Sequence, residues 1–214
     1  LASLNRRVML ASRSNAGAFL PAAKVVIDDA MMQLRRSLAI NAFRDGSGSR
    51  AKGEELNVAK TVLKLGDRED AVNFQVGDVL QSAALKTAGA VRAGTATITA
   101  INRSAGELTF GADITTLITG ALETDFIYQH GDYDSTLKGL GAWLPQTAPD
   151  ATLFFNVDRS SDTDMLGGVR YDATGQLRYE GLIDGQSEVA MVGGGRPTHA
   201  FCNPVDFRAL IKEL

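Results

Sequence analysis

Cysteine, histidine and tryptophan are scarce in this chain of 214 residues. The one cysteine, Cys202, excludes an intramolecular disulfide, and two histidines are too few to build a Cys/His zinc site with it. No apolar run approaches the roughly 20 residues that a bilayer-spanning helix needs. Residues 1–13 contain three arginines but no apolar stretch typical of a signal peptide. The sequence therefore predicts no metal, no cofactor and no membrane association.

Charge is close to balanced overall but unevenly distributed. The net charge is -3, with 44% hydrophobic and 22% charged residues, which indicates a folded chain and argues against a dedicated nucleic-acid binder. Residues 1–64 carry 11 basic and 5 acidic side chains, whereas residues 65–137 carry 4 and 10. Such segregation is typical of surfaces that meet a surface of opposite sign, within the molecule or on a neighbour.

A long helix is the strongest secondary-structure prediction, and we place it at 21–45. Pro21 suits a first helical turn, and Gly46 ends the pattern. Apolar residues recur at the helical period, namely Ile27, Met31, Leu34, Leu38 and Ala42. A helix of this length, roughly 35 Å, needs a long partner surface to cover its apolar face.

Short strands separated by glycine turns are predicted between residues 72 and 134. Residues 95–101 alternate between polar and apolar, residues 102–106 form a hairpin loop, and 125–128 form another strand. This spacing predicts a small antiparallel barrel or sandwich of roughly 60 residues. Because helix-rich sequence flanks it on both sides, we interpret it as an insertion.

The last third is predicted to be mixed α and β. We expect a strand at 153–157, a helix at 177–192 with Leu182 and Ile183 facing inward, and a strand at 198–202. Asn203 and Pro204 form a helix start, because asparagine caps a helix and proline suits its first position.

No group of residues predicts catalysis. His199, Cys202 and Asp206 do not converge on one face, because positions 199 and 202 of a strand point to opposite sides. The acids of 158–164 resemble a cation loop but miss the EF-hand spacing, so we interpret them as a solvated turn with helix-capping side chains. The Gly193–Arg196 segment follows a helix and matches no phosphate-binding motif, so we interpret it as a flexible connection.

The order of these elements resembles the major capsid proteins of tailed bacteriophages and prophages, which have the Hong Kong 97-type fold. The residues that carry the resemblance are Arg44–Gly48, Gly77–Asp78, Ile98–Arg103, Gly106–Phe110, Gly131–Asp132, Lys138–Pro145, Asn156–Ser160, Leu166–Arg170, Glu180–Asp184 and Asn203–Phe207. It covers about 22–214 and is nearest to the branch that inserts a β-barrel after the long helix.

The resemblance implies an α+β fold in four parts. Residues 1–20 would be an arm or extended-loop remnant, 21–71 a peripheral domain with a spine helix, 72–137 the inserted barrel, and 138–214 the return segment and axial domain. The family has a longer N-terminal arm and further strands after position 214, so we expect the chain to be a piece of something longer. No Lys/Asn pair is assigned to the crosslink that some members form.

The implied function is a non-enzymatic shell subunit that forms hexamers and pentamers around packaged DNA without binding it specifically. Portal, scaffolding and decoration proteins are the other implied partners, and the implied location is the virion, after assembly in the bacterial cytoplasm. We expect intersubunit contacts at nine residues: Arg35, Arg36, Asp158, Arg159, Asp162, Asp164, Gly193, Gly194 and Arg196.

Two alternatives remain open at this point. One is a hydrolase that uses the acids of 158–164 in a cleft. The other is a ligand-binding barrel, such as a phage tail component, which would need an aromatic platform drawn from Phe110, Phe126, Tyr128 and Tyr133.

Overall fold

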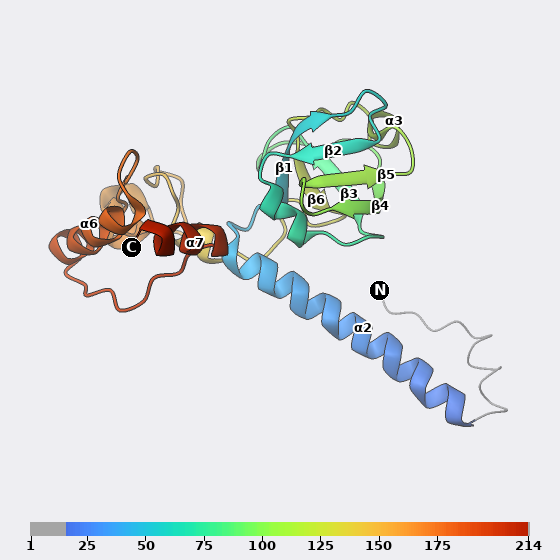
Figure 1. Ribbon diagram of the computed structural model, residues 1–214, viewed down its shortest axis with the longest axis horizontal. Helices are drawn as coiled ribbons and strands as arrows, with labels where there is room; N and C mark the ends of the chain where they lie inside the picture. Colours follow the sequence, from blue (N-terminus) through green and yellow to red (C-terminus); the bar gives the residue numbers. More distant parts are fainter. Residues whose placement is uncertain (1–15, 214) are drawn as a thin grey trace. The chain divides into compact units, whose positions relative to one another are not determined.

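The fold combines α-helices with a closed six-stranded antiparallel β-barrel (Figure 1). The computed structural model describes residues 16–213, with side chains from Lys24 onward. Two compact units divide the chain between Leu140 and Gly141. The first holds the long helix α2 and the barrel, and the second holds short helices.

The barrel closes in the order β1-β2-β5-β4-β3-β6, and every neighbouring pair is antiparallel. Its strands are β1 (Ser49–Leu56), β2 (Val62–Leu65), β3 (Val79–Ala83), β4 (Ala96–Asn102), β5 (Glu107–Phe110) and β6 (Phe126–Gln129). The 3-10 helix η2 (Arg68–Asn73) and the short helix α3 (Ile114–Leu117) lie in its connections. Because β1 pairs with β6, the sheet has no free edge. No strand of the barrel therefore offers a row of unpaired backbone groups to another strand.

Alternation along the strands fills the barrel with apolar side chains. In β4, Ala96 and Ile98 are buried while Thr97 and Thr99 are exposed, which confirms the predicted half-buried strand. The core cluster is drawn from all six strands and their connections: Ala51, Leu63, Leu65, Ala71, Phe74, Leu80, Ala96, Ile98, Leu108, Phe110, Ile114, Ile118, Ala121 and Ile127. A barrel of this size is therefore packed solid.

The barrel begins well before the predicted start at residue 72, because β1 and β2 supply two of its six strands. The segment of β1, SRAKGEEL, contains few of the β-branched and aromatic residues that favour strands. At Gly53 the strand packs closely against the turn before β6. An added Cβ at this position would lie 2.1 Å from the Glu123 carbonyl oxygen. Tertiary packing, and not local preference, makes this segment a strand.

The long helix α2 spans Ala16–Phe43. Its predicted start at Pro21 was wrong, because the alanines and leucine before Pro21 are good helix formers and a proline near a helix start removes few hydrogen bonds. It ends shortly before Gly46, whose φ of 88° turns the chain into the barrel. None of its described residues, 24–43, is fully buried.

The second unit contains five short helical segments: α4 (Leu140–Trp143, which begins at the unit boundary), η3 (Arg159–Ser161), α5 (Thr163–Gly167), α6 (Arg178–Val192) and α7 (Pro204–Glu213). The predicted helix at 177–192 is confirmed by α6, although Leu182 and Ile183 are exposed and do not face inward. The predicted cap of α7 is also confirmed, because the Asn203 side-chain oxygen accepts a hydrogen bond from the Val205 amide at 3.0 Å.

Neither predicted strand of this unit forms. Phe154 and Val157 exchange two backbone hydrogen bonds across a tight turn, in which Phe155 and Asn156 have φ of 49° and 65°. Residues 198–202 form neither helix nor strand, and Phe201 is 90% exposed. A strand needs a neighbour to pair its backbone groups, and no strand lies beside either segment in residues 141–213.

Candidate functional site

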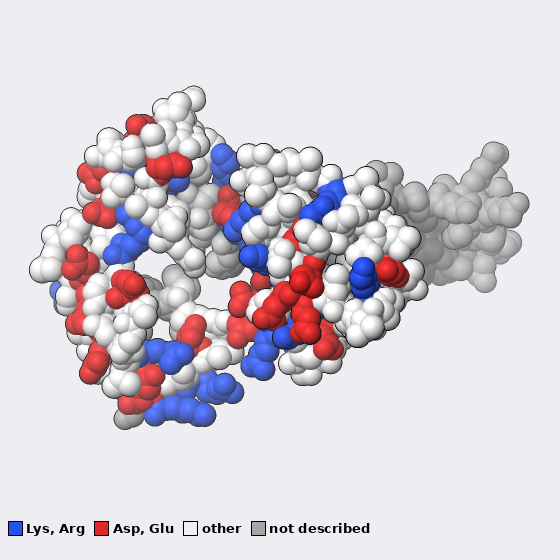
Figure 2. Space-filling model, turned by 90° about the horizontal axis from the view of Figure 1, so that it is seen from above, with Lys and Arg blue, Asp and Glu red and all other residues white. Residues whose placement is uncertain are grey.

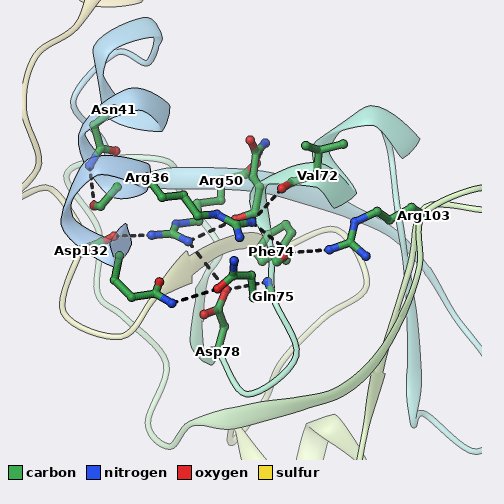
Figure 3. Close-up of polar contacts among 12 residues, drawn as sticks. Arg36, Asn41, Arg50, Val72, Phe74, Gln75, Asp78, Arg103 and Asp132 are labelled. Carbon is green, nitrogen blue, oxygen red and sulfur yellow. Dashed lines mark hydrogen bonds and ion pairs between the residues drawn. The ribbon is translucent and has the colours of Figure 1, made fainter. Parts of the chain in front are cut away.

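Three arginines of the first unit converge on one turn of the barrel (Figure 3). Arg36 of α2 donates hydrogen bonds to the carbonyl oxygens of Val72 and Phe74 at 2.8 and 3.1 Å. Arg103 of the β4–β5 loop donates to the same Phe74 oxygen at 3.2 Å, and Arg50 of β1 donates to the Asn73 oxygen at 3.2 Å. We call Arg36, Arg50 and Arg103 the arginine cluster; it joins the long helix to the barrel.

Arg50 is the buried member of the cluster. Its side chain is 5% exposed and lies 3.4 Å from a carboxylate oxygen of Asp132 and 3.9 Å from one of Asp78. Burial lowers the pKa of Arg50, and the two carboxylates oppose that shift. Burial likewise raises the pKa of Asp132, and Arg50 opposes it. The buried charges are held by each other, which makes removal of any one of them costly.

The linker from α2 to β1 is tied at both ends. Arg44 donates to the Asp70 carboxylate at 2.6 Å and to the Arg50 carbonyl oxygen at 2.8 Å. Asp45 accepts from the Ser47 hydroxyl at 2.6 Å and pairs with Lys86 at 2.6 Å. Burial works against ionisation of Asp45, but these hydrogen bonds together keep its pKa below the usual value. The long helix is therefore fixed to the barrel by a continuous set of polar contacts.

A polar pocket of about 260 Å³ lies where α2 meets the barrel. It is lined by Gln33, Leu34, Arg36, Ser37, Arg50, Asp78, Gln129, His130 and Asp132. The charges of its two arginines and two aspartates cancel, and all four side chains are engaged in the hydrogen bonds and ion pairs described above. We therefore assign this pocket a structural role.

Arg36 was predicted as an intersubunit contact to acidic neighbours; in the structure it donates hydrogen bonds to its own barrel, and the contact with a neighbouring subunit stays a prediction. We expect Arg36→Ala to free two carbonyls and loosen α2 from the barrel, lowering the free energy of unfolding by about 1–3 kcal/mol. Arg35→Ala is the matched control, because Arg35 is exposed on the same helix. Urea unfolding followed by far-UV circular dichroism measures both; equal losses would contradict this role.

One face of α2 is apolar and open. Ile27, Met31, Leu34 and Leu38 recur at the helical period, and their side chains are between 46% and 63% exposed. We call these four residues the apolar stripe. The expectation that a long partner surface covers this face is not met within the described chain.

The acidic loop 158–164 caps helices, as predicted. Asp158 accepts hydrogen bonds from the Ser160 amide and hydroxyl, and these bonds lower its pKa. Asp162 accepts from the Met165 amide at 3.0 Å, and Asp164 pairs with Arg170 at 3.2 Å. Two of these carboxylates cap helices and the third pairs with an arginine. The structure therefore does not bring them together as a catalytic or cation site.

Arg159 lies in an aromatic group that the sequence did not predict. It donates to the carbonyl oxygens of Ala142 and Trp143 at 3.0 and 3.2 Å, and its guanidinium lies 4.0 Å from the centre of the Phe154 ring. The rings of Trp143 and Phe155 stack at 5.6 Å, and both are more than half exposed. Exposed aromatics beside an arginine are typical of protein–protein contacts.

The glycines at the end of α6 form a helix end followed by irregular chain. The Gly193 amide donates to the Val189 oxygen at 3.0 Å, and Gly194 has a φ of 62°. Arg196 lies in the irregular segment that follows. The nine predicted contact residues thus lie on α2 in the first unit and on two segments of the second unit, 158–164 and 193–196.

Neither alternative gains a site from the geometry. The acids 158–164 cap helices, and the aromatics Phe110 and Tyr128 are buried in the barrel, where burial also raises the pKa of Tyr128. The side chains of Phe126 and Tyr133 are only partly covered, and Tyr133 packs edge-on against Tyr128. Residues 16–213 contain no group of three potential metal ligands and no helix long and apolar enough to cross a membrane.

Comparisons with protein-family models, curated proteins and solved structures found no match to this chain. In the face shown in Figure 2, acidic and basic side chains are interspersed, and a group of acidic side chains lies near the middle of the view.

Proposed function

We propose that this chain is a structural subunit that assembles with copies of itself into a shell. The proposal rests on the second unit, which has almost no buried core. Among residues 141–213, only Ala142 and Gly167 are buried, while large apolar side chains such as Trp143, Met191 and Phe201 are exposed. A unit of this size needs a hydrophobic core for its stability, so these side chains must be covered by other protein.

Three further observations support assembly over catalysis. The apolar stripe leaves a second surface uncovered on α2. A shallow apolar groove of about 310 Å³, lined by Tyr171, Leu182 and Val189 among others, adds a third on the second unit. The acids of 158–164, which were the candidates for a hydrolase, are engaged in helix caps and an ion pair. Extensive repeated surfaces are what closed shells require.

The finer proposal follows the resemblance to tailed-phage capsid proteins. In it, α2 is the spine helix, the barrel is the inserted domain, and the second unit is the axial part whose loops meet around capsomer centres. Asp158, Arg159, Asp162, Asp164, Gly193, Gly194, Arg196 and Arg35 lie on surfaces available for such contacts. The shell would enclose phage DNA without binding it specifically, which suits a net charge of -3.

Electron microscopy of the protein expressed at high concentration tests the proposal. Rings, tubes or closed particles are expected in negative stain, with sedimentation far above that of a monomer of 22.7 kDa. Two variants serve as test and control. Trp143→Ser should reduce the yield of particles, because it removes an exposed aromatic side chain, whereas Val58→Ser on the exposed barrel turn should leave the yield unchanged. A stable monomer at all concentrations would overturn the proposal.

A further inference from the structure

Most of the apolar stripe of α2 points away from the barrel, and only Leu34, at one edge of the stripe, lines the pocket between α2 and the barrel. Successive residues of an α-helix turn by about 100°, so Ile27, Met31, Leu34 and Leu38 share an arc about 60° wide. The partly covered residues Arg36, Ser37, Ile40 and Asn41 define the covered side, and the centre of that side is about 120° from the centre of the stripe. A second helix can therefore lie along the stripe without displacing the barrel.

The spacing of the stripe is symmetric. Its four residues are separated by four, three and four positions, a pattern that reads the same from either end. A second α2 laid antiparallel places Ile27 opposite Leu38 of the second copy, and Met31 opposite Leu34 of the second copy. Alternating spacings of three and four are those at which helices interlock side chains, and a two-fold axis makes one surface complementary to itself.

Charges beside the stripe select the antiparallel direction. Asp28 and Arg35 flank the stripe on the same side, one at its N-terminal half and the other at its C-terminal half. In an antiparallel pair each Asp28 lies near Arg35 of the second copy, whereas in a parallel pair these residues lie on opposite sides of the contact and do not meet. Arg35 also has no acidic residue three or four positions away in its own helix.

We propose that α2 binds α2 of a second copy in an antiparallel, two-fold symmetric contact centred between Met32 and Gln33. It rests on the proposed function only in taking the partner to be a second copy of this chain. The stripe extends over about 18 Å of helix, which is less surface than the roughly 1,200 Å² of a stable dimer. The contact is therefore weak alone and gains strength within an assembly.

Thiol crosslinking distinguishes the two directions. Ile27→Cys and Leu38→Cys, which lie opposite each other in the antiparallel pair but about 16 Å along the helix from their own counterparts, are made separately in a Cys202→Ser background, because Cys202 is exposed. A short bismaleimide should join the two variants only when they are mixed. Crosslinking of either variant with itself would indicate a parallel pair, and absence of crosslinks in the mixture at millimolar protein would also overturn the proposal.

Charge exchange tests the proposed pairing with the same readout. In the mixed pair, Asp28→Arg in both partners should lower the crosslinking rate about tenfold, because it faces Arg35 of the second copy. The double change Asp28→Arg with Arg35→Asp should restore the rate. Asp29→Arg is the matched control, because position 29 lies on the far side of the helix, and it should leave the rate within about twofold.

The outcomes separate this contact from the shell proposal. Particles that form without the mixed crosslink would refute the contact and leave the shell proposal standing. Mixed crosslinks in a protein that never forms particles would support the contact and refute the shell. Far-UV circular dichroism of each variant verifies that α2 and the barrel are folded, because the changed side chains are exposed.

Discussion

Replacing Asp125 with alanine should lower the free energy of unfolding of the barrel by about 3–5 kcal/mol, since it leaves buried donors without a partner. The Asp125 carboxylate is almost fully buried and accepts hydrogen bonds from Arg92, from the Ser82 hydroxyl at 3.1 Å and from the Leu122 amide at 3.0 Å. It thus joins β3, the β3–β4 loop and the turn before β6. Urea unfolding of the full chain measures the loss.

Glu54→Ala provides the matched control for Asp125. Glu54 pairs with Lys64 at 2.9 Å, but both side chains are exposed and solvent screens the pair, so its loss should leave the urea midpoint almost unchanged. Amide hydrogen exchange of β3 and β6 gives a second readout confined to the barrel. Protection in these strands should fall in Asp125→Ala and persist in Glu54→Ala. Similar effects of the two changes would contradict the central role of Asp125.

Gly48→Ala should destabilise the protein by about 3 kcal/mol or more, through two separate effects. Gly48 has a φ of 81°, which favours glycine, and an added Cβ would lie 2.0 Å from the Asp132 carbonyl oxygen. The linker between α2 and β1 would have to move away from the β6 turn. We expect a lower urea midpoint.

Gly77→Ala separates the two effects at Gly48. Gly77 has a similar φ of 93°, but a Cβ there meets no atom within 4 Å. Its substitution should therefore cost only the conformational penalty, about 1–2 kcal/mol. The difference in free energy of unfolding between the two variants therefore gives the cost of the steric clash with the Asp132 carbonyl oxygen. If both lose the same stability, the linker is less tightly packed than the structure indicates.

Local patterns predicted the elements whose cause is local. β4 was recognisable because polar and apolar residues alternate through it, and α7 because Asn203 and Pro204 mark its start. The capping role of Asp158 and Asp162 was also predictable, because each bonds an amide two or three residues ahead. In these cases the residues that interact lie close together in the sequence.

Elements whose cause is distant escaped prediction. β1 carries lysine and two glutamates and becomes a strand through pairing with β2 and β6. Residues 198–202 were predicted as a strand but have no strand to pair with in residues 141–213. The role of Arg36 was missed for a related reason: its acceptors are backbone carbonyls, which every residue carries, so no residue type marks them.

The path of the chain through the barrel has a consequence for evolution and for engineering. β1 and β6 pair side by side, with Ser49 opposite Tyr128, and an added Cβ at Gly139 would lie 2.2 Å from the Asn41 oxygen at the end of α2. After the barrel, the chain thus returns to the end of α2. A whole module can be gained, lost or exchanged between such neighbouring points while the surrounding scaffold keeps its course, and the exposed β1–β2 turn at Val58 offers a site for grafting foreign peptides.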